Sequence, residues 1–125
     1  MPTALDPDRF ELDPIDGWLS PDSRQLLFTV ELADGSAKDI SNDSLEWYLL
    51  AKPYASDGDA VVSGSDPGVE VRTDVVDPTA GESRVDIKQG TLTGEWGEYH
   101  QRVTVDPPDG SRQTWQGRVT LTDGD

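Results

Sequence analysis

The chain has 125 residues, no cysteine, and 25 acidic against 10 basic side chains, which gives a formal net charge of −15. This length suits one domain with a single core. The charge argues against binding to a nucleic-acid backbone, which needs clustered Lys and Arg, and the absence of cysteine excludes disulfides and thiolate metal sites. No stretch approaches the roughly 18 consecutive apolar residues of a membrane span, and no basic, apolar leader opens the chain, so neither a span nor a secretory signal is expected.

The acidic residues are mostly aspartate, with 18 Asp against 7 Glu, and the basic residues are mostly arginine, with 7 Arg against 3 Lys. This bias resembles that of proteins from salt-loving organisms. In molar salt the Debye length falls to about 3 Å, so the self-repulsion of such a surface is screened. We expect a halophilic source, and the alternative is an acidic protein from ordinary salt.

Residues 1–22 are rich in Pro and Asp, and their apolar side chains follow neither a helical nor a strand period. Termini are usually disordered unless something holds them. We expect an extended N-terminal arm that lies on its own domain or on a neighbour, with aromatic side chains as anchors. A floppy tail is the alternative.

From residue 23 to residue 125 the chain reads as one β-domain, because short alternating segments are separated by turn residues. The expected strands lie at 24–32, 44–52, 60–63, 68–76, 83–88, 98–105 and 112–121. No segment shows an apolar helical stripe over three turns. About seven strands at this spacing predict an all-β fold, an antiparallel β-sandwich.

Alternation also predicts which side chains face the core. The expected inward residues are Leu26, Phe28, Val30, Leu32, Leu45, Trp47, Leu49, Ala51, Val69, Val71, Val75, Val85, Ile87, Tyr99, Gln101, Val103, Val105, Trp115, Gly117, Val119 and Leu121. The last two strands are expected to form a hairpin that reverses at 106–110.

The only histidine, His100, lies at an outward position of a predicted strand. Nucleophilic triads and most zinc sites need a histidine beside other specific groups, and none is evident here. No serine lies in a Gly-x-Ser-x-Gly elbow, and no acid lies inside an apolar run that would raise its pKa. We therefore predict no catalytic residue and no enzyme. A hydrolase that uses a carboxylate pair is the enzymatic alternative.

A cation site is the second chemical candidate. Asp57, Asp59 and Asp66 lie among glycines and offer the oxygen ligands that Ca²⁺ or Mg²⁺ prefers, and Asp106 and Asp109 flank a second turn. The EF-hand spacing is absent, and Asp and Gly are also the ordinary residues of turns. We predict no cofactor and keep the first three aspartates as weak candidates for a loosely bound cation.

Interface residues are predicted from aromatic side chains without a clear core position and from outward arginines. Phe10 and Trp18 belong to the expected arm, and Trp96 lies at a strand edge. Buried aromatic residues dominate protein contacts. Arg102 and Arg118 lie on the outward face of the last hairpin, where each could pair with an acid of an adjacent copy.

The order of strands and turns resembles a known family in two stretches, LLFTVELADGSAKDISNDSLEWYLL and, after DPTAGESRVDI, GTLTGEWGEYHQRVTVDPPDGSRQTWQGRVTL. Over about residues 25–121 the chain is similar to the N-terminal domain of phage baseplate upper proteins, a small Ig-like domain of tailed-phage virions. The resemblance implies an Ig-like sandwich and a non-enzymatic virion component, and it transfers no catalytic residue. With the acidic bias it implies a virus of a haloarchaeon.

We therefore expect a structural subunit of a halophilic tailed virus, in the tail or baseplate, the neck or the capsid surface. Its expected partners are other virion proteins and copies of itself, in a homo-oligomer within the particle, with no nucleic acid and no membrane. The expected location is the virion, assembled in the host cytoplasm. The alternative is a cellular Ig-like binding or adhesion module of a haloarchaeon.

Overall fold

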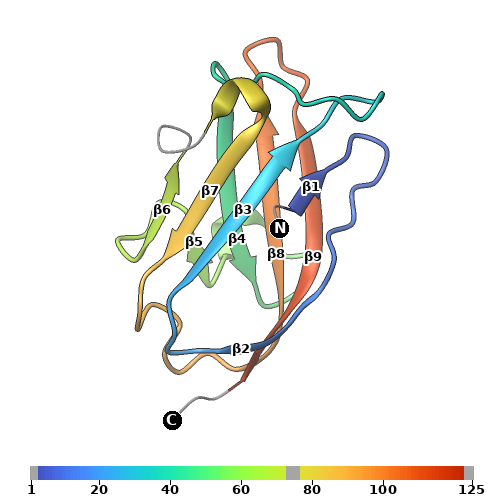
Figure 1. Cartoon of the computed structure of the whole chain (residues 1–125). Helices are drawn as coiled ribbons and strands as arrows, with labels where there is room; N and C mark the ends of the chain where they lie inside the picture. The colour runs from blue at the N-terminus through green and yellow to red at the C-terminus, as the bar shows by residue number, and fades with distance from the viewer. Residues whose placement is uncertain (1–2, 73–76, 123–125) are drawn as a thin grey trace.

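The computed structural model describes residues 3–72 and 77–122, which form two β-sheets packed face to face (Figure 1). Its strands are β1 (Thr3–Leu5), β2 (Ile15–Leu19), β3 (Arg24–Val30), β4 (Ser44–Leu50), β5 (Val62–Ser63), β6 (Val69–Arg72), β7 (Glu82–Ile87), β8 (Gly97–Asp106) and β9 (Gln113–Thr122). Two single 3₁₀ turns, η1 (Asp57–Asp59) and η2 (Pro78–Ala80), complete the elements of the described residues. The expected all-β, Ig-like sandwich is confirmed.

The four-stranded sheet has the order β1-β3-β7-β6, and the five-stranded sheet has the order β2-β9-β8-β4-β5. The longest ladder joins β8 and β9, from Gly97 opposite Leu121 to Val105 opposite Gln113. It is the hairpin expected at the end of the chain. Most ladders are antiparallel, but β1 pairs with β3, and β2 with β9, in parallel. The expected antiparallel pattern is therefore corrected to two mixed sheets.

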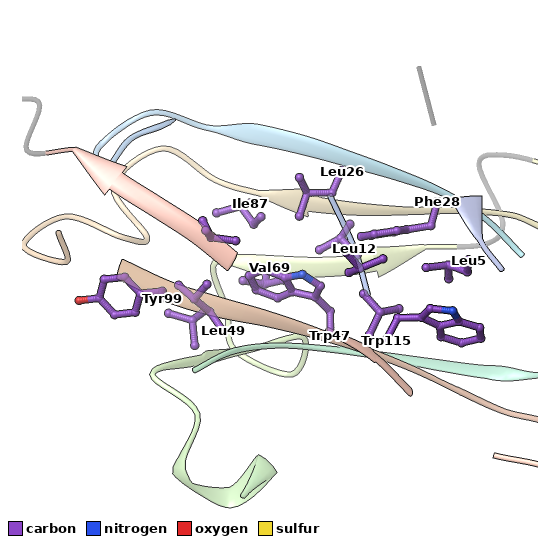
Figure 2. Close-up of a cluster of buried hydrophobic side chains, with 14 of the residues drawn as sticks. Leu5, Leu12, Leu26, Phe28, Trp47, Leu49, Val69, Ile87, Tyr99 and Trp115 are labelled. Atoms are coloured by element: carbon purple, nitrogen blue, oxygen red, sulfur yellow. The ribbon is translucent and has the colours of Figure 1, made fainter. Parts of the chain in front are cut away.

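The core lies between the sheets and follows the alternation of the sequence. Along β3, for example, Leu26, Phe28 and Val30 are buried, while Gln25 and Leu27 are exposed. The largest buried side chains include Trp47 from β4 and Trp115 from β9 (Figure 2). Full burial of one such apolar side chain stabilises the fold by about 1.5–3 kcal/mol. Alternation thus places the main source of stability between the two sheets.

Some expected inward positions differ, because the strands end earlier than the pattern predicts. Leu32 and Ala51 are exposed, since β3 ends at Val30 and β4 at Leu50. Leu45 and Val71 are half-buried and pack against the edge of the core. Val75 lies outside the described residues.

The expected arm forms the outer edges of both sheets. We call residues 3–19 the strap. It starts as β1 beside β3 in the four-stranded sheet, passes over to the five-stranded sheet, and continues there as β2 beside β9 (Figure 1). Of the two positions expected for the arm, on its own domain or on a neighbour, the structure shows the first. Its apolar side chains Leu5, Leu12 and Trp18 are buried in the common core, so the strap is part of the sandwich.

A notch in β9 receives the middle of the strap. Gly117 has no side chain, and a Cβ there would lie 2.7 Å from Cβ and 2.8 Å from the carbonyl oxygen of Leu12. Backbone bonds on either side hold the strap in this notch: Leu12 N donates to Gln116 O at 2.9 Å, and Gln116 N donates to Phe10 O at 3.1 Å. The inward glycine predicted from the sequence is therefore the seat of Leu12.

Candidate functional site

The outer face of the five-stranded sheet carries the outward residues of β8 and β9 that the sequence singles out. His100 lies opposite Arg118, and Arg102 lies opposite Gln116. The connection between β4 and β5, residues 51–61, folds back over this face, because Pro53 O accepts a hydrogen bond from Arg102 Nη2 at 3.0 Å. Leu50, in register with His100 and outside the main core, is fully buried. This part of the sheet is therefore covered by its own chain.

Arg102 fixes this connection to the sheet. Its Nη1 donates to Asp57 Oδ1 at 2.9 Å, and its Nε donates to Gln116 Oε1 at 3.0 Å. Arg112 approaches the other oxygen of Asp57, with 3.4 Å between Nη2 and Oδ2. We call Asp57, Arg102, Arg112 and Gln116 the Arg102 cluster. Charge-assisted bonds of this kind are stronger than neutral ones, so the cluster ties η1 to two strands.

The cluster corrects one predicted interface residue. The Arg102 side chain is only 14% exposed and pairs with Asp57 of its own chain, so it offers no free charge to an adjacent copy. Arg118 is half exposed, and its guanidinium lies 4.0 Å from both Asp16 Oδ1 and Glu98 Oε1. An exposed pair at this distance contributes little, so a contact between Arg118 and a partner stays a prediction.

Tyr48 lies beside the cluster on β4 and donates its hydroxyl proton to Glu46 Oε2. This hydrogen bond is the main reason that the pKa of Tyr48 is raised to about 12, and burial and the negative charges of Glu46 and Asp57 act in the same direction. At neutral pH the phenol is therefore protonated and acts as a donor. It is not poised to act as a base.

A shallow groove separates the strap from Pro53 on this face. It is lined by Glu11, Leu12, Pro14, Pro53, His100, Gln116, Gly117 and Arg118. His100 is half-buried in it. Acid and base chemistry needs a partner that orients the histidine and a reacting group within hydrogen-bond reach. No hydrogen bond to His100 from another described side chain is observed, and the groove is an open surface between the strap and Pro53 over strands β8 and β9.

Two of the three cation candidates, Asp57 and Asp66, line one pocket, but each of the three carboxylates already has a partner within the chain. Asp57 faces the arginines of the Arg102 cluster, Asp59 Oδ2 accepts from Ser56 Oγ at 2.9 Å, and Asp66 Oδ2 accepts from Ser63 N at 2.9 Å. Throughout residues 3–72 and 77–122 no three His, Cys, Asp or Glu side chains are placed to hold a metal ion. These weak candidates therefore do not form a three-ligand metal site in the described part of the chain.

Aspartates instead stabilise turns, as is usual for this residue. In three Asp-x-Ser turns the carboxylate accepts bonds from the backbone and hydroxyl of the serine two residues later, at Asp34, Asp39 and Asp109. The side-chain bond from that serine is the main cause of the lowered pKa of each of these aspartates. Their ionised form is therefore part of the turn structure.

The predicted aromatic anchors have different environments. Trp18 is 3% exposed, because strand β2 turns its indole into the core, so in the closed single chain it offers no surface to a partner. Phe10 is 48% exposed, and its ring centre lies 5.6 Å from that of buried Trp115. Trp96 is 66% exposed, in the connection between β7 and β8, and Tyr54 is 78% exposed in the connection between β4 and β5.

Strand β2, which contains Leu19, and the connection between β7 and β8, which contains Trp96, lie at the same end of the sandwich (Figure 1). Gly97, next to Trp96, is in register with Leu121, and Leu19 is in register with Thr122. Leu19 is also one of the exposed large apolar side chains. We call this region, with Trp96 and Leu19, the β2 end. It presents two exposed apolar side chains on a chain with a net charge of −15.

Comparisons with known proteins identify no family for this chain. No family model matches the chain, and a search of curated proteins finds no match. Among solved structures, the chain is similar to an ASH/PapD-like domain of human CEP192, its PapD-like domain 7, with 9% identity and a TM-score of 0.38 over 94% of this chain and 84% of that one. The class, an Ig-like β-sandwich, follows from the chain's own two sheets and the core between them. In the described part of the chain no helix has the length and apolar character of a membrane span.

Proposed function

We propose that this chain is a non-enzymatic assembly module, a sandwich that makes protein–protein contacts through the β2 end. The observation that carries the proposal is the exposure of Trp96, whose indole is 66% exposed on a chain with a net charge of −15. Tryptophan is enriched among the residues that carry most of the binding energy of protein interfaces. An acidic surface favours solubility, so a large exposed indole is best explained by a partner that covers it.

The distribution of charge supports contacts made by apolar side chains. Each of the ten basic side chains is already engaged within the chain: eight have an acid within 4.0 Å, and two lie against aromatic rings. The eight are Arg9, Lys38, Arg72, Arg84, Lys88, Arg102, Arg112 and Arg118, and the two are Arg24 and Lys52. A partner therefore meets acids and exposed apolar groups. Salt should strengthen such contacts by screening the like charges.

A more specific form of the proposal is a structural subunit of a tailed-virus particle, from a halophilic archaeal virus. Its support is the resemblance in strand and turn order to the virion domain named above, together with the excess of Asp over Glu and of Arg over Lys. In that setting the partners are copies of this chain and other virion proteins. Mass spectrometry of purified particles tests this form, and recovery of the chain with cellular surface proteins instead would favour the adhesion-module alternative.

Sedimentation velocity of the wild type and of Trp96→Ala tests the assembly proposal, at about 0.1 M and about 1 M NaCl, where the Debye lengths are about 10 and 3 Å. We expect larger assemblies at the higher salt. We expect Trp96→Ala to weaken association by at least about tenfold, since truncation of an interface anchor costs about 2 kcal/mol or more.

Tyr54→Ala is the matched control, because it removes an exposed aromatic ring from a different connection. We expect it to leave association unchanged. A wild type that stays monomeric in molar salt and has no partner in virion preparations would contradict the proposed function. Equal loss in both variants would contradict the role of the β2 end.

A further inference from the structure

The strands of the strap pair with the sandwich along one edge of each sheet. Strand β1 pairs with β3 over three positions, Thr3 to Leu5, and β2 pairs with β9 at Ile15, Trp18 and Leu19, with a register shift between the first two. Strands β3 to β9 supply every other ladder of both sheets in the described residues. The strap can therefore leave its place without breaking the pairing among the other strands.

The seat of the strap is specific for this segment. Leu5 and Leu12 enter the core from the strap (Figure 2), and Trp18 is buried further along it. Gly117 leaves room for the backbone of Leu12, and Trp115 Nε1 donates to Asp6 O at 2.8 Å. An unoccupied seat would expose an apolar slot and the unpaired edges of β3 and β9. The occupant that matches the spacing of these contacts is another copy of the same segment.

Only four residues, 20–23, join β2 to β3. Asp22 N donates to Leu19 O at 3.0 Å to close the turn, and Pro21 O accepts from Gly90 N at 2.9 Å. A short connection that reverses the chain is the usual hinge of strand exchange, because extending it carries the terminal segment onto a neighbour. All contacts of the strap outside this turn would be the same within one chain and between two chains.

We propose that the strap exchanges between two copies of this chain, so that residues 3–19 of each copy occupy the seat on the other. The partner is a second copy, and the inference rests on the proposed function in assembly. Each copy carries a charge of −15, so salt that screens the repulsion between copies favours the exchanged dimer over the closed monomer. Exchange contributes contacts beyond those of the β2 end, because the buried strap contacts then join two chains.

A disulfide between two singly substituted chains tests the exchange. Leu19 and Thr122 are register partners on β2 and β9, and both are exposed. Adjacent strands bring Cα atoms to about 5 Å, which suits a disulfide, and the chain has no cysteine of its own. Leu19→Cys and isotope-labelled Thr122→Cys chains are refolded together in molar salt, oxidised, and weighed by mass spectrometry. We expect a covalent heterodimer.

The control replaces Thr122→Cys with Ser111→Cys, which is also exposed but lies in the β8–β9 hairpin. We expect at least about tenfold less heterodimer from the control pair, because exchange holds residues 19 and 122 together at a high effective concentration. We expect the same difference in Trp96→Ala chains, in which association through the β2 end is weakened and cannot by itself bring residues 19 and 122 together. The double variant Leu19→Cys/Thr122→Cys, oxidised in dilute solution, shows whether the pair closes within one folded chain.

Equal yields from the test and control pairs would overturn the exchange. If the wild type assembles in molar salt but the 19–122 heterodimer stays at the control level, the strap remains on its own chain and the assembly proposal survives. If the wild type is also monomeric and without a partner, the assembly proposal fails as well. The two failures are therefore distinguishable.

Discussion

At Gly117 the absence of a side chain is a packing requirement. The backbone there is not in the left-handed region, and the position faces the core on β9, where a larger residue would ordinarily add apolar contacts. Contact with Leu12 of the strap excludes even a methyl group, since a Cβ would lie 2.7 Å from Leu12 Cβ. The strap and the glycine therefore depend on each other.

We expect Gly117→Ala to lower the free energy of unfolding by about 1–3 kcal/mol, the usual cost of overpacking a closely packed site. Urea denaturation followed by tryptophan fluorescence measures the change. Gly58→Ala is the matched control, because its Cβ would meet nothing closer than 4.0 Å. Equal free energies of unfolding for the two variants would show that the strap can move away from residue 117 without loss of stability.

Tyr99 predicts how stability depends on alkaline pH. Burial, followed by the hydrogen bond to Glu95, raises the pKa of Tyr99 to about 12, compared with about 10 in an unfolded chain. Between these values the unfolded state loses a proton that the folded state keeps. The stabilisation is therefore complete below pH 10 and is lost as the pH rises to about 12.

We expect wild-type stability to fall more steeply than that of Tyr99→Phe between pH 10 and pH 12, by up to about 2–3 kcal/mol in total. Urea denaturation at a series of pH values measures both slopes. Tyr48 is unchanged in Tyr99→Phe, so its own contribution remains in both proteins. Identical slopes would show that the phenol of Tyr99 titrates alike in the folded and unfolded states.

At the scale of elements, the connection between β4 and β5 is ordered by one arginine on a different strand. Residues 51–61 contain one short 3₁₀ turn, and no residue of that turn is buried. The connection instead relies on Arg102, which bonds to Asp57 and Pro53. A connection held in this way should open locally before the sheets separate.

We expect Arg102→Ala to speed hydrogen exchange across residues 51–61 and to lower global stability by about 1–3 kcal/mol, because Asp57 and Pro53 O lose a charged donor. Hydrogen exchange measured by mass spectrometry resolves the segment. Arg112→Ala is the control: its side chain is 52% exposed, and such pairs contribute about 0–1 kcal/mol. Equal hydrogen-exchange rates across residues 51–61 in both variants would show that Arg102 does not order this connection.

The apolar pattern of the sequence did not predict strands β1 and β2 of the strap. Its buried residues, Leu5, Leu12 and Trp18, have no strand period because the segment crosses from one sheet to the other between them. Leu5 enters the core beside β3, and Leu12 and Trp18 enter it beside β9. The pattern therefore resembled a tail with scattered apolar residues, although the segment is packed along its length.

At the scale of the whole molecule, different residues determine the fold and the net charge. The core contains apolar side chains from alternate positions of the strands, while the acids lie in turns, at strand ends and on the outer faces. Eight of the ten bases lie within 4.0 Å of acids of the same chain, which leaves a strong negative excess toward any partner. The salt dependence expected for assembly belongs to this scale, because the repulsion is a property of the total charge.

The sequence by itself determined the all-β class, most core positions of β3, β4 and β7 to β9, and the closing hairpin. These features depend on a period of two and on turn residues, which act over a few neighbours. Only the tertiary structure decided that Trp18 is buried, that Asp57 neutralises Arg102, and that Gly117 seats Leu12. Each of these joins residues far apart in the chain, and no local pattern specifies which distant residues the sheet edges bring together.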